Sequence, residues 1–306
     1  MPIPSAVEMV PAVVLRTRPL GEADLLVVLL TPGHGKLETA ARHARNSKKR
    51  FPGGLPSGLR GLAGLARGRG TLARLENFEA SADHSPVGRD LDRFAYVAYL
   101  CELTDELVLA RHADPLIFAA LCTALEAVIA GAPRPGELRR YELALLHTLG
   151  LLPALELCCV CGEPAIASSQ GVAFDAVRGG VLCLAHDRGA SHLPPEVLRA
   201  AGELAAGADP GPLEDASVET RRGLRDLTQT ALRAHMRRPL HSLAFFAALP
   251  RGEAIQRPNA GANAGPQASE PSPGEPGEPT WGSGGGELSG EVPAQDPEVM
   301  GSDPDD

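Results

Sequence analysis

The sequence predicts an α+β protein with several domains, in which a small β-barrel precedes a mostly α-helical domain and a disordered acidic tail. Apolar residues recur with a period near two up to residue 80 and with a period near 3.6 from residue 91. A cysteine-rich segment, 156–190, interrupts the helical part. Residues 251–306 contain 11 Gly and 9 Pro and few large apolar side chains, so they cannot bury enough surface to order. The predicted domains are therefore 1–82, 83–250 and 251–306.

Five short segments near the N-terminus have the alternation or the apolar runs of β-strands, and Gly, Pro or Asn bounds each one. They are 10–18, 22–31, 35–45, 59–68 and 70–80. Such a set suits a closed barrel, because closure removes exposed strand edges. An OB-type barrel is the leading interpretation, although an SH3-like barrel would give nearly the same strand pattern.

The helical part begins with three segments that each place apolar residues on one face. These residues are Phe94, Ala98, Cys101 and Val108, then Ile117, Leu121, Leu125 and Val128, then Leu138, Tyr141, Leu145 and Leu149. Further helices are expected at 194–207, where two prolines suit a first turn, and at 218–236. The last is amphipathic around Leu224, Leu227 and Ala231. We interpret Cys101 and Cys122, alone on helices, as core residues.

The cysteine-rich segment has the spacing of a metal clip. Its residues read Cys158-x2-Cys161, a gap of 21 residues, and Cys183-x2-His186, with Gly162 placed for the tight turn of a zinc knuckle. Three cysteines and one histidine complete a tetrahedron and leave no position for water, which predicts one structural zinc ion. Buried free thiols or disulfides are the alternative, and His192 could replace His186 as the fourth ligand. Cys159 should point away from the ion, toward solvent or as a spare ligand.

Catalytic interpretations have little support in the sequence. The H-x-E and P-C-x-x-C pair of zinc deaminases and the H-E-x-x-H of metalloproteases do not occur. The stretch GHGKLE, 33–38, lacks the glycine spacing and the Ser or Thr of a phosphate-binding loop. The sequence therefore favours a protein that is not an enzyme.

Charge is distributed unevenly along the chain. The net charge of −9 equals that of residues 251–306 alone, whereas residues 1–80 hold 12 basic and 6 acidic residues. Five of the basic residues fall in RHARNSKKR, 42–50, and others lie on neighbouring strands. A basic loop on a barrel can bind the nucleic-acid backbone without base-specific geometry. The candidate DNA-binding residues are Lys36, Arg42, Arg45, Lys48, Lys49, Arg50, Arg67, Arg69 and Arg74.

Aromatic residues limit this interpretation to electrostatic binding. Within residues 1–80 only Phe51 and Phe78 are available to stack on bases, so binding should depend on salt and be indifferent to sequence. A second interpretation is an interaction scaffold whose basic barrel binds acidic peptides. The acidic tail, which holds Trp281, is a further candidate: tethered near the barrel, it would compete with DNA as an internal polyanion.

No stretch is apolar enough for a membrane span or has the layout of a signal peptide, so a cytoplasmic protein is expected. In that compartment clustered cysteines stay reduced, which favours metal over disulfide.

Several separated motifs resemble the RecO family of bacterial recombination mediators. They are VVLRTRPLGEADLLVVLLTPGHGKLE (13–38), AYVAYLCELTDEL (95–107), LLHTLGLLPALELCCVCG (145–162) and RGGVLC (178–183), in that order. The first contains Gly21-Glu22 and the run Leu30, Thr31, His34, Gly35 and Lys36. The resemblance covers residues 8–249 and excludes the tail.

This resemblance implies a DNA-binding protein without catalytic activity. Such proteins bind single- and double-stranded DNA and anneal complementary strands. With RecR they help load RecA onto DNA coated by single-stranded-DNA-binding protein, which implies a cytoplasmic, nucleoid-associated location. By the match, Arg42, Arg45, Lys48, Lys49 and Arg50 take the place of the family's basic barrel loop, and Cys158, Cys161, Cys183 and His186 that of its zinc ligands. A histidine stands here where a fourth cysteine is common, and Cys159 is additional.

Overall fold

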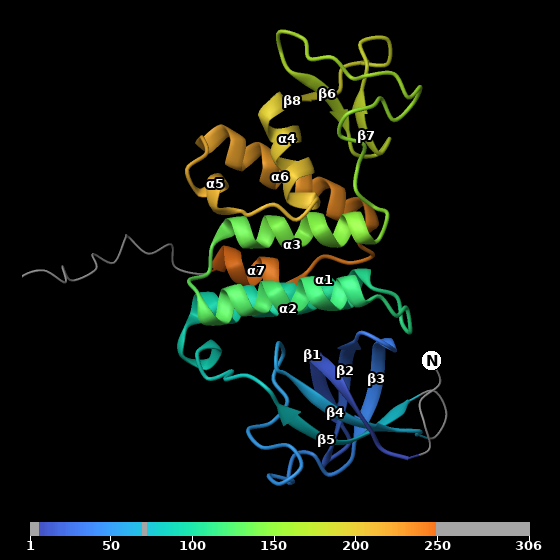
Figure 1. Ribbon diagram of the computed structural model, residues 1–306, viewed down its shortest axis with the longest axis vertical. Helices are drawn as coiled ribbons and strands as arrows, with labels where there is room; N and C mark the ends of the chain where they lie inside the picture. The colour runs from blue at the N-terminus through green and yellow to red at the C-terminus, as the bar shows by residue number, and fades with distance from the viewer. Residues whose placement is uncertain (1–5, 69–71, 249–306) are drawn as a thin grey trace, which may run out of the picture. The chain divides into compact units, whose positions relative to one another are not determined.

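The computed structural model describes residues 6–68 and 72–248, and the predicted acidic tail, 251–306, lies outside them. Its N-terminal part is a closed five-stranded barrel (Figure 1). The strands are β1 (Glu8–Leu20), β2 (Asp24–Thr31), β3 (Gly35–Ala41), β4 (Arg60–Ala66) and β5 (Ala73–Ala80). Their order is β1-β2-β3-β5-β4, with β1 also pairing with β4. Four pairings are antiparallel and β3–β5 is parallel, the arrangement of an OB-type barrel.

The period-two pattern of β1 and β2 gives the barrel wall two buried faces. Val14 and Leu29 point into the barrel interior, whereas Val13 and Leu30 belong to the core that the barrel shares with the helices. Alternation sends successive side chains to opposite faces of a strand, so one apolar run serves both cores. The barrel and the helical part consequently form one compact unit.

The helical part lies against this wall in layers (Figure 1). A short 3₁₀ turn, η1 (Val87–Arg89), leads into the helices. They are α1 (Leu91–Leu107), α2 (Pro115–Ala130), α3 (Pro135–Thr148), α4 (Pro195–Ala205), α5 (Gly211–Glu214), α6 (Val218–His235) and α7 (His241–Ala248). Helix α1 packs on β1 and on α2 and α7, while α3 contacts α2 on one side and α4 and α6 on the other. The predicted apolar faces of α2, α3 and α6 are buried, apart from a half-buried Leu149.

Helix α1 differs from its prediction. Cys101 and Val108 are buried, but Phe94 is 49 % exposed, so the predicted inward face is wrong at its first turn. The helix is covered by β1, α2 and α7 together, and Ala95, Val97 and Leu100 are buried instead. A helix enclosed on several sides carries apolar residues on most of its surface, and its periodicity then does not identify one inward face.

The cysteine-rich segment forms a small module between α3 and α4. Three short strands, β6 (Val172–Asp175), β7 (Gly180–Leu182) and β8 (Ser191–Leu193), pair in the order β7-β6-β8. Val172, Phe174 and Val181 pack with Val197 of α4 and Leu224 of α6 in a third apolar core. The module is therefore anchored to the helices by its apolar face.

None of the helices in the described part of the chain combines the length and the apolar character needed to cross a membrane.

Candidate metal centre and nucleic-acid interface

Two turns bring the four predicted metal ligands together. In the first turn the Gly162 N–H donates to the Cys158 carbonyl (2.8 Å) and the Cys158 N–H to the Glu163 carbonyl (2.7 Å), with Gly162 at φ +76°. In the second, which directly follows β7, the N–H groups of His186 and Asp187 donate to the Cys183 carbonyl (2.9 and 3.0 Å). The Cys159 N–H donates to the Val181 carbonyl (3.0 Å) and joins the turns.

The ligand atoms have the spacing of a tetrahedral site. All four lie within 4.8 Å of one another. The Cys161 and Cys183 sulfurs are 3.7 Å apart, and His186 Nδ1 lies 3.7 Å from the Cys158 sulfur and 3.2 Å from that of Cys183. Sulfurs at about 2.3 Å from a zinc ion in tetrahedral geometry are about 3.8 Å from each other, and a sulfur and an imidazole nitrogen are about 3.5 Å apart. These residues fit a four-coordinate metal ion.

The electrostatics of the site favour metal-binding thiolate. Burial alone would raise the pKa of the Cys158 thiol, but hydrogen bonds from the backbone of Cys183, Val160 and Cys161 outweigh it and lower the pKa to about 6. The thiolate is the metal-binding form of cysteine. Within residues 6–68 and 72–248, Cys158, Cys161, Cys183 and His186 are the one group with metal-ligand geometry.

The structure also places His192, the alternative fourth ligand, and Cys159, the additional cysteine of this segment. His192 lies on β8 and its Nε2 is 2.9 Å from the Asp187 carboxylate, so it pairs with an acid and stays outside the ligand set. Cys159 is half-buried and packs against the small apolar cluster of Cys158, Ala173 and Leu182, which is neither a fully solvent-facing position nor a ligand position. Burial raises the pKa of the Cys159 thiol. The pKa of Cys101, which lies in the core as predicted, rises to about 12 because of burial.

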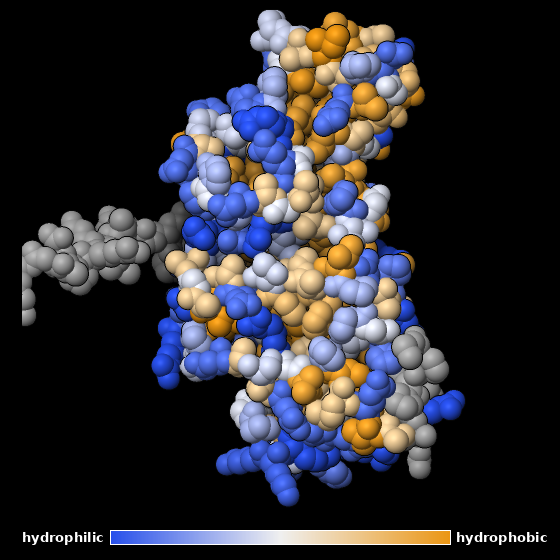
Figure 2. All heavy atoms as spheres, viewed as in Figure 1, coloured by the Kyte–Doolittle hydropathy of each residue, from blue (hydrophilic) through white to orange (hydrophobic). Residues whose placement is uncertain are grey.

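The basic segment 42–50 is a structured loop. It follows β3, which ends at Ala41 rather than at the predicted residue 45, and extends at the end of the barrel away from the helices (Figure 1). The Arg45 guanidinium donates to the Glu22 carbonyl (2.9 Å), and that of Arg50 donates to the Arg42 carbonyl (2.6 Å) and lies 5.3 Å from the Phe51 ring centre. Arg42, Arg45, Lys48 and Lys49 are exposed. Hydrophilic side chains gather at this end of the molecule (Figure 2).

Of the other candidate DNA-binding residues, Arg67 and Arg74 are exposed and Lys36 is mostly buried. Arg74 is exposed beside the loop, since β5 pairs with β3 at Ala40, but it forms an ion pair with Glu76. Arg67 is exposed at the end of β4, and Arg69 lies outside the described residues. Lys36 does not join this surface. Its ammonium is 3.3 Å from the Asp105 carboxylate on α1, and only 15 % of its side chain is exposed, so it ties the barrel to the helices.

Neither barrel phenylalanine is available for stacking. Phe51 is 3 % exposed and Phe78 2 %, and both belong to the barrel interior. Among the described residues, the candidate barrel surface therefore offers basic side chains and no exposed aromatic ring.

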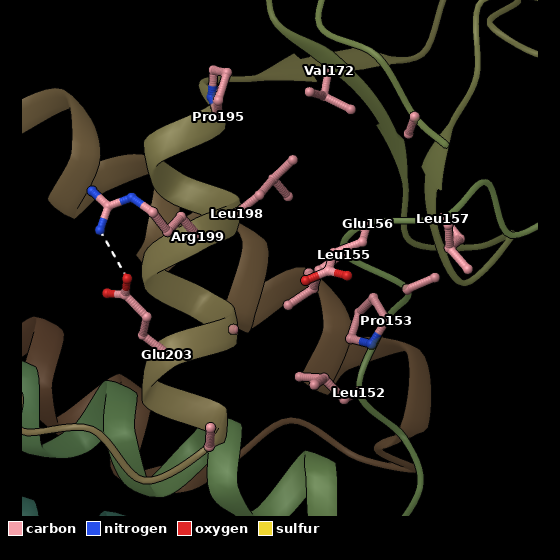
Figure 3. A pocket seen from close by; sticks show the side chains of 14 residues that line it. Leu152, Pro153, Leu155, Glu156, Leu157, Val172, Pro195, Leu198, Arg199 and Glu203 are labelled. Carbon is pink, nitrogen blue, oxygen red and sulfur yellow. Dashed lines mark hydrogen bonds and ion pairs between the residues drawn. The ribbon is translucent and has the colours of Figure 1, made fainter. Parts of the chain in front are cut away.

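An open groove of about 940 Å³ lies beside the contact between the module and α4, and residues 152–157 form its other wall (Figure 3). Leu152, Leu155 and Leu198 line it, and Arg199 pairs with Glu203 along the helix (2.9 Å). The lining is otherwise apolar apart from Glu156, and it offers no nucleophile with an adjacent base.

Sequence reasoning missed a buried ion pair in the helical part. Glu142 on α3 is fully buried, accepts a hydrogen bond from the Tyr99 hydroxyl of α1 and lies 2.7 Å from the Arg139 guanidinium. Burial raises the pKa of the Glu142 carboxyl, against the opposing effects of Arg139 and Tyr99. Opposite charges three residues apart, as at Arg139 and Glu142, indicate an ion pair on a helix. Ion pairs on a protein surface have the same spacing, so the sequence alone does not show that this pair is buried.

Comparisons with known proteins cover most of the described chain. The family model "Recombination protein O N terminal" matches residues 8–83, and "Recombination protein O C terminal" matches residues 88–244. A relative named DNA repair protein RecO from Anaeromyxobacter sp. (strain K) is 38 % identical over 195 residues, which are 63 % of this chain and 75 % of the relative. One of the same name from Myxococcus xanthus (strain DK1622) is 33 % identical over 239 residues, 77 % of this chain and 95 % of the relative.

Proposed function

The chain belongs to the RecO family of DNA repair proteins, and we propose that it acts as a recombination mediator that binds DNA through the basic loop 42–50 and catalyses no reaction. The proposal includes binding of single- and double-stranded DNA without sequence preference and annealing of complementary strands. Its main support is the exposed loop, in which Arg45 and Arg50 are fixed by backbone carbonyls while Lys48 and Lys49 extend into solvent.

Annealing requires that two like-charged strands approach each other. Cations that neutralise phosphates release condensed counterions and reduce the repulsion between the strands. This needs no nucleotide hydrolysis and no base-specific contact, and the loop supplies five cationic side chains within nine residues. The physical requirement for annealing and the composition of the loop therefore agree.

We propose zinc as the ion held by Cys158, Cys161, Cys183 and His186. Three thiolates and one imidazole are ligands that zinc prefers, and a site closed by four protein ligands is structural. The ion would crosslink the two turns of the module. The family membership further supports RecR, single-stranded-DNA-binding protein and, indirectly, RecA as partners, and a cytoplasmic location at the nucleoid; we assign no residues to these partners.

A strand-annealing assay with the full chain tests the proposal. Two complementary labelled oligonucleotides, mixed at low salt with no nucleotide cofactor, should pair faster in the presence of the protein, and higher salt should suppress the effect. The same mixture with single-stranded-DNA-binding protein and RecR tests the mediator step.

The scaffold alternative makes a different prediction in the same assay. If the basic loop binds acidic peptides instead, a glutamate-rich peptide would bind as tightly as a DNA strand of equal charge, and annealing would not be accelerated. That result would overturn the proposed function.

A further inference from the structure

A single exposed aromatic ring stands out among the described side chains. Phe94, in the first turn of α1, is 49 % exposed, whereas the other described aromatic side chains are buried or half-buried. Its ring contacts that of Phe245 on α7 edge to face, with centroids 5.8 Å apart. An edge contact leaves much of the Phe94 ring free to stack on another flat group.

Phe94 lines a pocket of about 550 Å³ between β1, α1 and α7. Its apolar walls are Phe94, Phe245, Ala98 and Leu15, and polar groups lie around them. This combination of an apolar surface with a few polar groups, at a volume of several hundred Å³, is typical of sites for small flat ligands.

The acids of the pocket are already compensated. Asp105 lies 2.8 Å from Arg16 and 3.3 Å from Lys36. Glu102 accepts hydrogen bonds from the backbone N–H groups of His241 and Ser242, at 2.9 and 2.8 Å, where α7 begins. Arg238, also in the lining, pairs with Glu106 at 2.8 Å. The pocket therefore presents little net charge, which suits an uncharged ring better than a phosphate.

The pocket adjoins β1 and the connection between β3 and β4, and that connection contains the basic loop. Arg16 of β1 is 38 % exposed at the rim and contacts Asp105 through Nε. Ser57, in the lining, belongs to the same β3–β4 connection as the loop. That connection is held along β1, because the Thr17 hydroxyl donates to the Leu55 carbonyl (2.8 Å) and the Gly58 N–H to the Val14 carbonyl (2.7 Å).

The separation of the loop and the pocket fits a short single strand. Strand β1 leads from the pocket, at Arg16, to its own end at Leu20, and four steps of ~3.3 Å span roughly 13 Å. The turn that follows contacts the loop, because the Arg45 guanidinium donates to the Glu22 carbonyl. OB-type barrels cover roughly 4–16 nucleotides of single strand, which is ample for this distance.

We propose that the Phe94 pocket binds an unpaired nucleobase of single-stranded DNA whose backbone is held by the basic loop. The proposal rests on the proposed DNA-binding function and adds to it a site on the helical part. Because a base in a duplex is stacked and paired, the pocket takes single strands only. The loop gives affinity for any DNA, and the pocket adds a preference for unpaired strands.

The test compares two single strands of equal length and charge, about twelve nucleotides each. One is oligo-dT and the other has the same backbone without bases, and binding to the full chain is followed by fluorescence anisotropy. Stacking of one base predicts that the protein binds oligo-dT roughly 5- to 150-fold more tightly than the abasic strand. Phe94→Ala should remove this difference and leave affinity for the abasic strand and for duplex unchanged.

Matched variants separate stacking from apolar contact and from loss of folding. Phe94→Tyr keeps the ring and should bind as the parent does, whereas Phe94→Leu keeps apolar volume and should bind as Phe94→Ala does. Leu116→Ala, at an exposed apolar residue of α2 outside the pocket, should have no effect.

Two results would overturn the inference while DNA binding persists: equal affinity of the parent protein for both strands, or an undiminished preference for oligo-dT in Phe94→Ala. Absence of binding to either strand would instead refute the proposed function on which the inference rests.

Discussion

The basic loop can be tested quantitatively through the salt dependence of DNA binding, with Lys48→Ala and Lys49→Ala combined in one variant. Both lysines are exposed on the loop. The structure favours them over Arg45 and Arg50, because the latter hold the loop through the carbonyls of Glu22 and Arg42. The double substitution therefore removes two positive charges while it preserves the loop conformation.

The expected magnitude follows from counterion release. Each phosphate contact on a single strand contributes about −0.7 to the slope of log K against log salt. If the five basic residues of 42–50 make one contact each, the slope is about −3.5, and removal of two contacts reduces it to about −2.1. Between about 50 and 200 mM salt the parent protein should lose roughly a hundredfold in affinity and the variant roughly twentyfold.

The measurement is a titration of a labelled single strand at four or more salt concentrations. A control variant, Arg188→Ala with Arg233→Ala, removes the same charge from exposed residues of the cysteine-rich module and of α6, and its slope should equal that of the parent protein. An unchanged slope in the lysine variant, or an equal reduction in the control, would refute the assignment of the loop as the phosphate-binding surface.

Three further predictions concern stability and the metal. Cys158→Ser and His186→Ala should lower the melting temperature and the metal content before they affect DNA affinity, because a metal ion in a closed site stabilises the fold. His192→Ala should retain the metal, since His192 pairs with Asp187. Thermal unfolding and elemental analysis of the three variants test this. Gly35→Ala should cost about 2 kcal/mol or more in urea unfolding, since φ at this position is +66° and a Cβ would meet the His112 carbonyl. Glu142→Gln tests the buried carboxyl, whose folded-state pKa is raised above its ordinary 4.5 by burial. The free energy of unfolding of the parent protein, relative to that of the variant, should therefore be greatest below pH 4.5 and decrease as pH rises through the folded-state pKa. If urea titrations show that this difference in unfolding free energy is constant or rises over the same pH range, the pKa of Glu142 is not raised in the folded protein.

The sequence was informative wherever local pattern determines structure. The five strands, the apolar faces of α2 and α6 and the four candidate metal ligands all follow from short spacings. The structure confirms the strands and the faces, and it brings the four candidate ligands together. The sequence predicted an OB-type barrel, although strand count alone does not distinguish it from an SH3-like barrel. The parallel pairing of β3 with β5, a contact between distant segments, confirms the OB-type barrel.

The remaining differences arise from contacts across long sequence separations. As a basic residue of the barrel, Lys36 is a reasonable candidate for DNA binding from the sequence alone. Its ion pair with Asp105, 69 positions later, places it instead in the contact between the barrel and the helices. Phe94 was expected in the core because its periodicity matches, but burial of α1 depends on which neighbours surround it. The predicted third strand extended past Ala41 because no Gly, Pro or Asn occurs between Gly35 and Asn46, whereas the chain leaves the strand before His43, which has φ +52°.

Because β1 and β2 are buried on both faces, the barrel is not expected to be stable when it is separated from the helices. A fragment ending at residue 82 would expose Val13, Leu15, Val28 and Leu30 to water together and would leave Arg16 and Lys36 without Asp105. Such an apolar stripe on a free barrel promotes aggregation. A minimal fragment that carries the proposed DNA-binding loop would have to retain α1, so the barrel alone is not suited to transfer onto another protein.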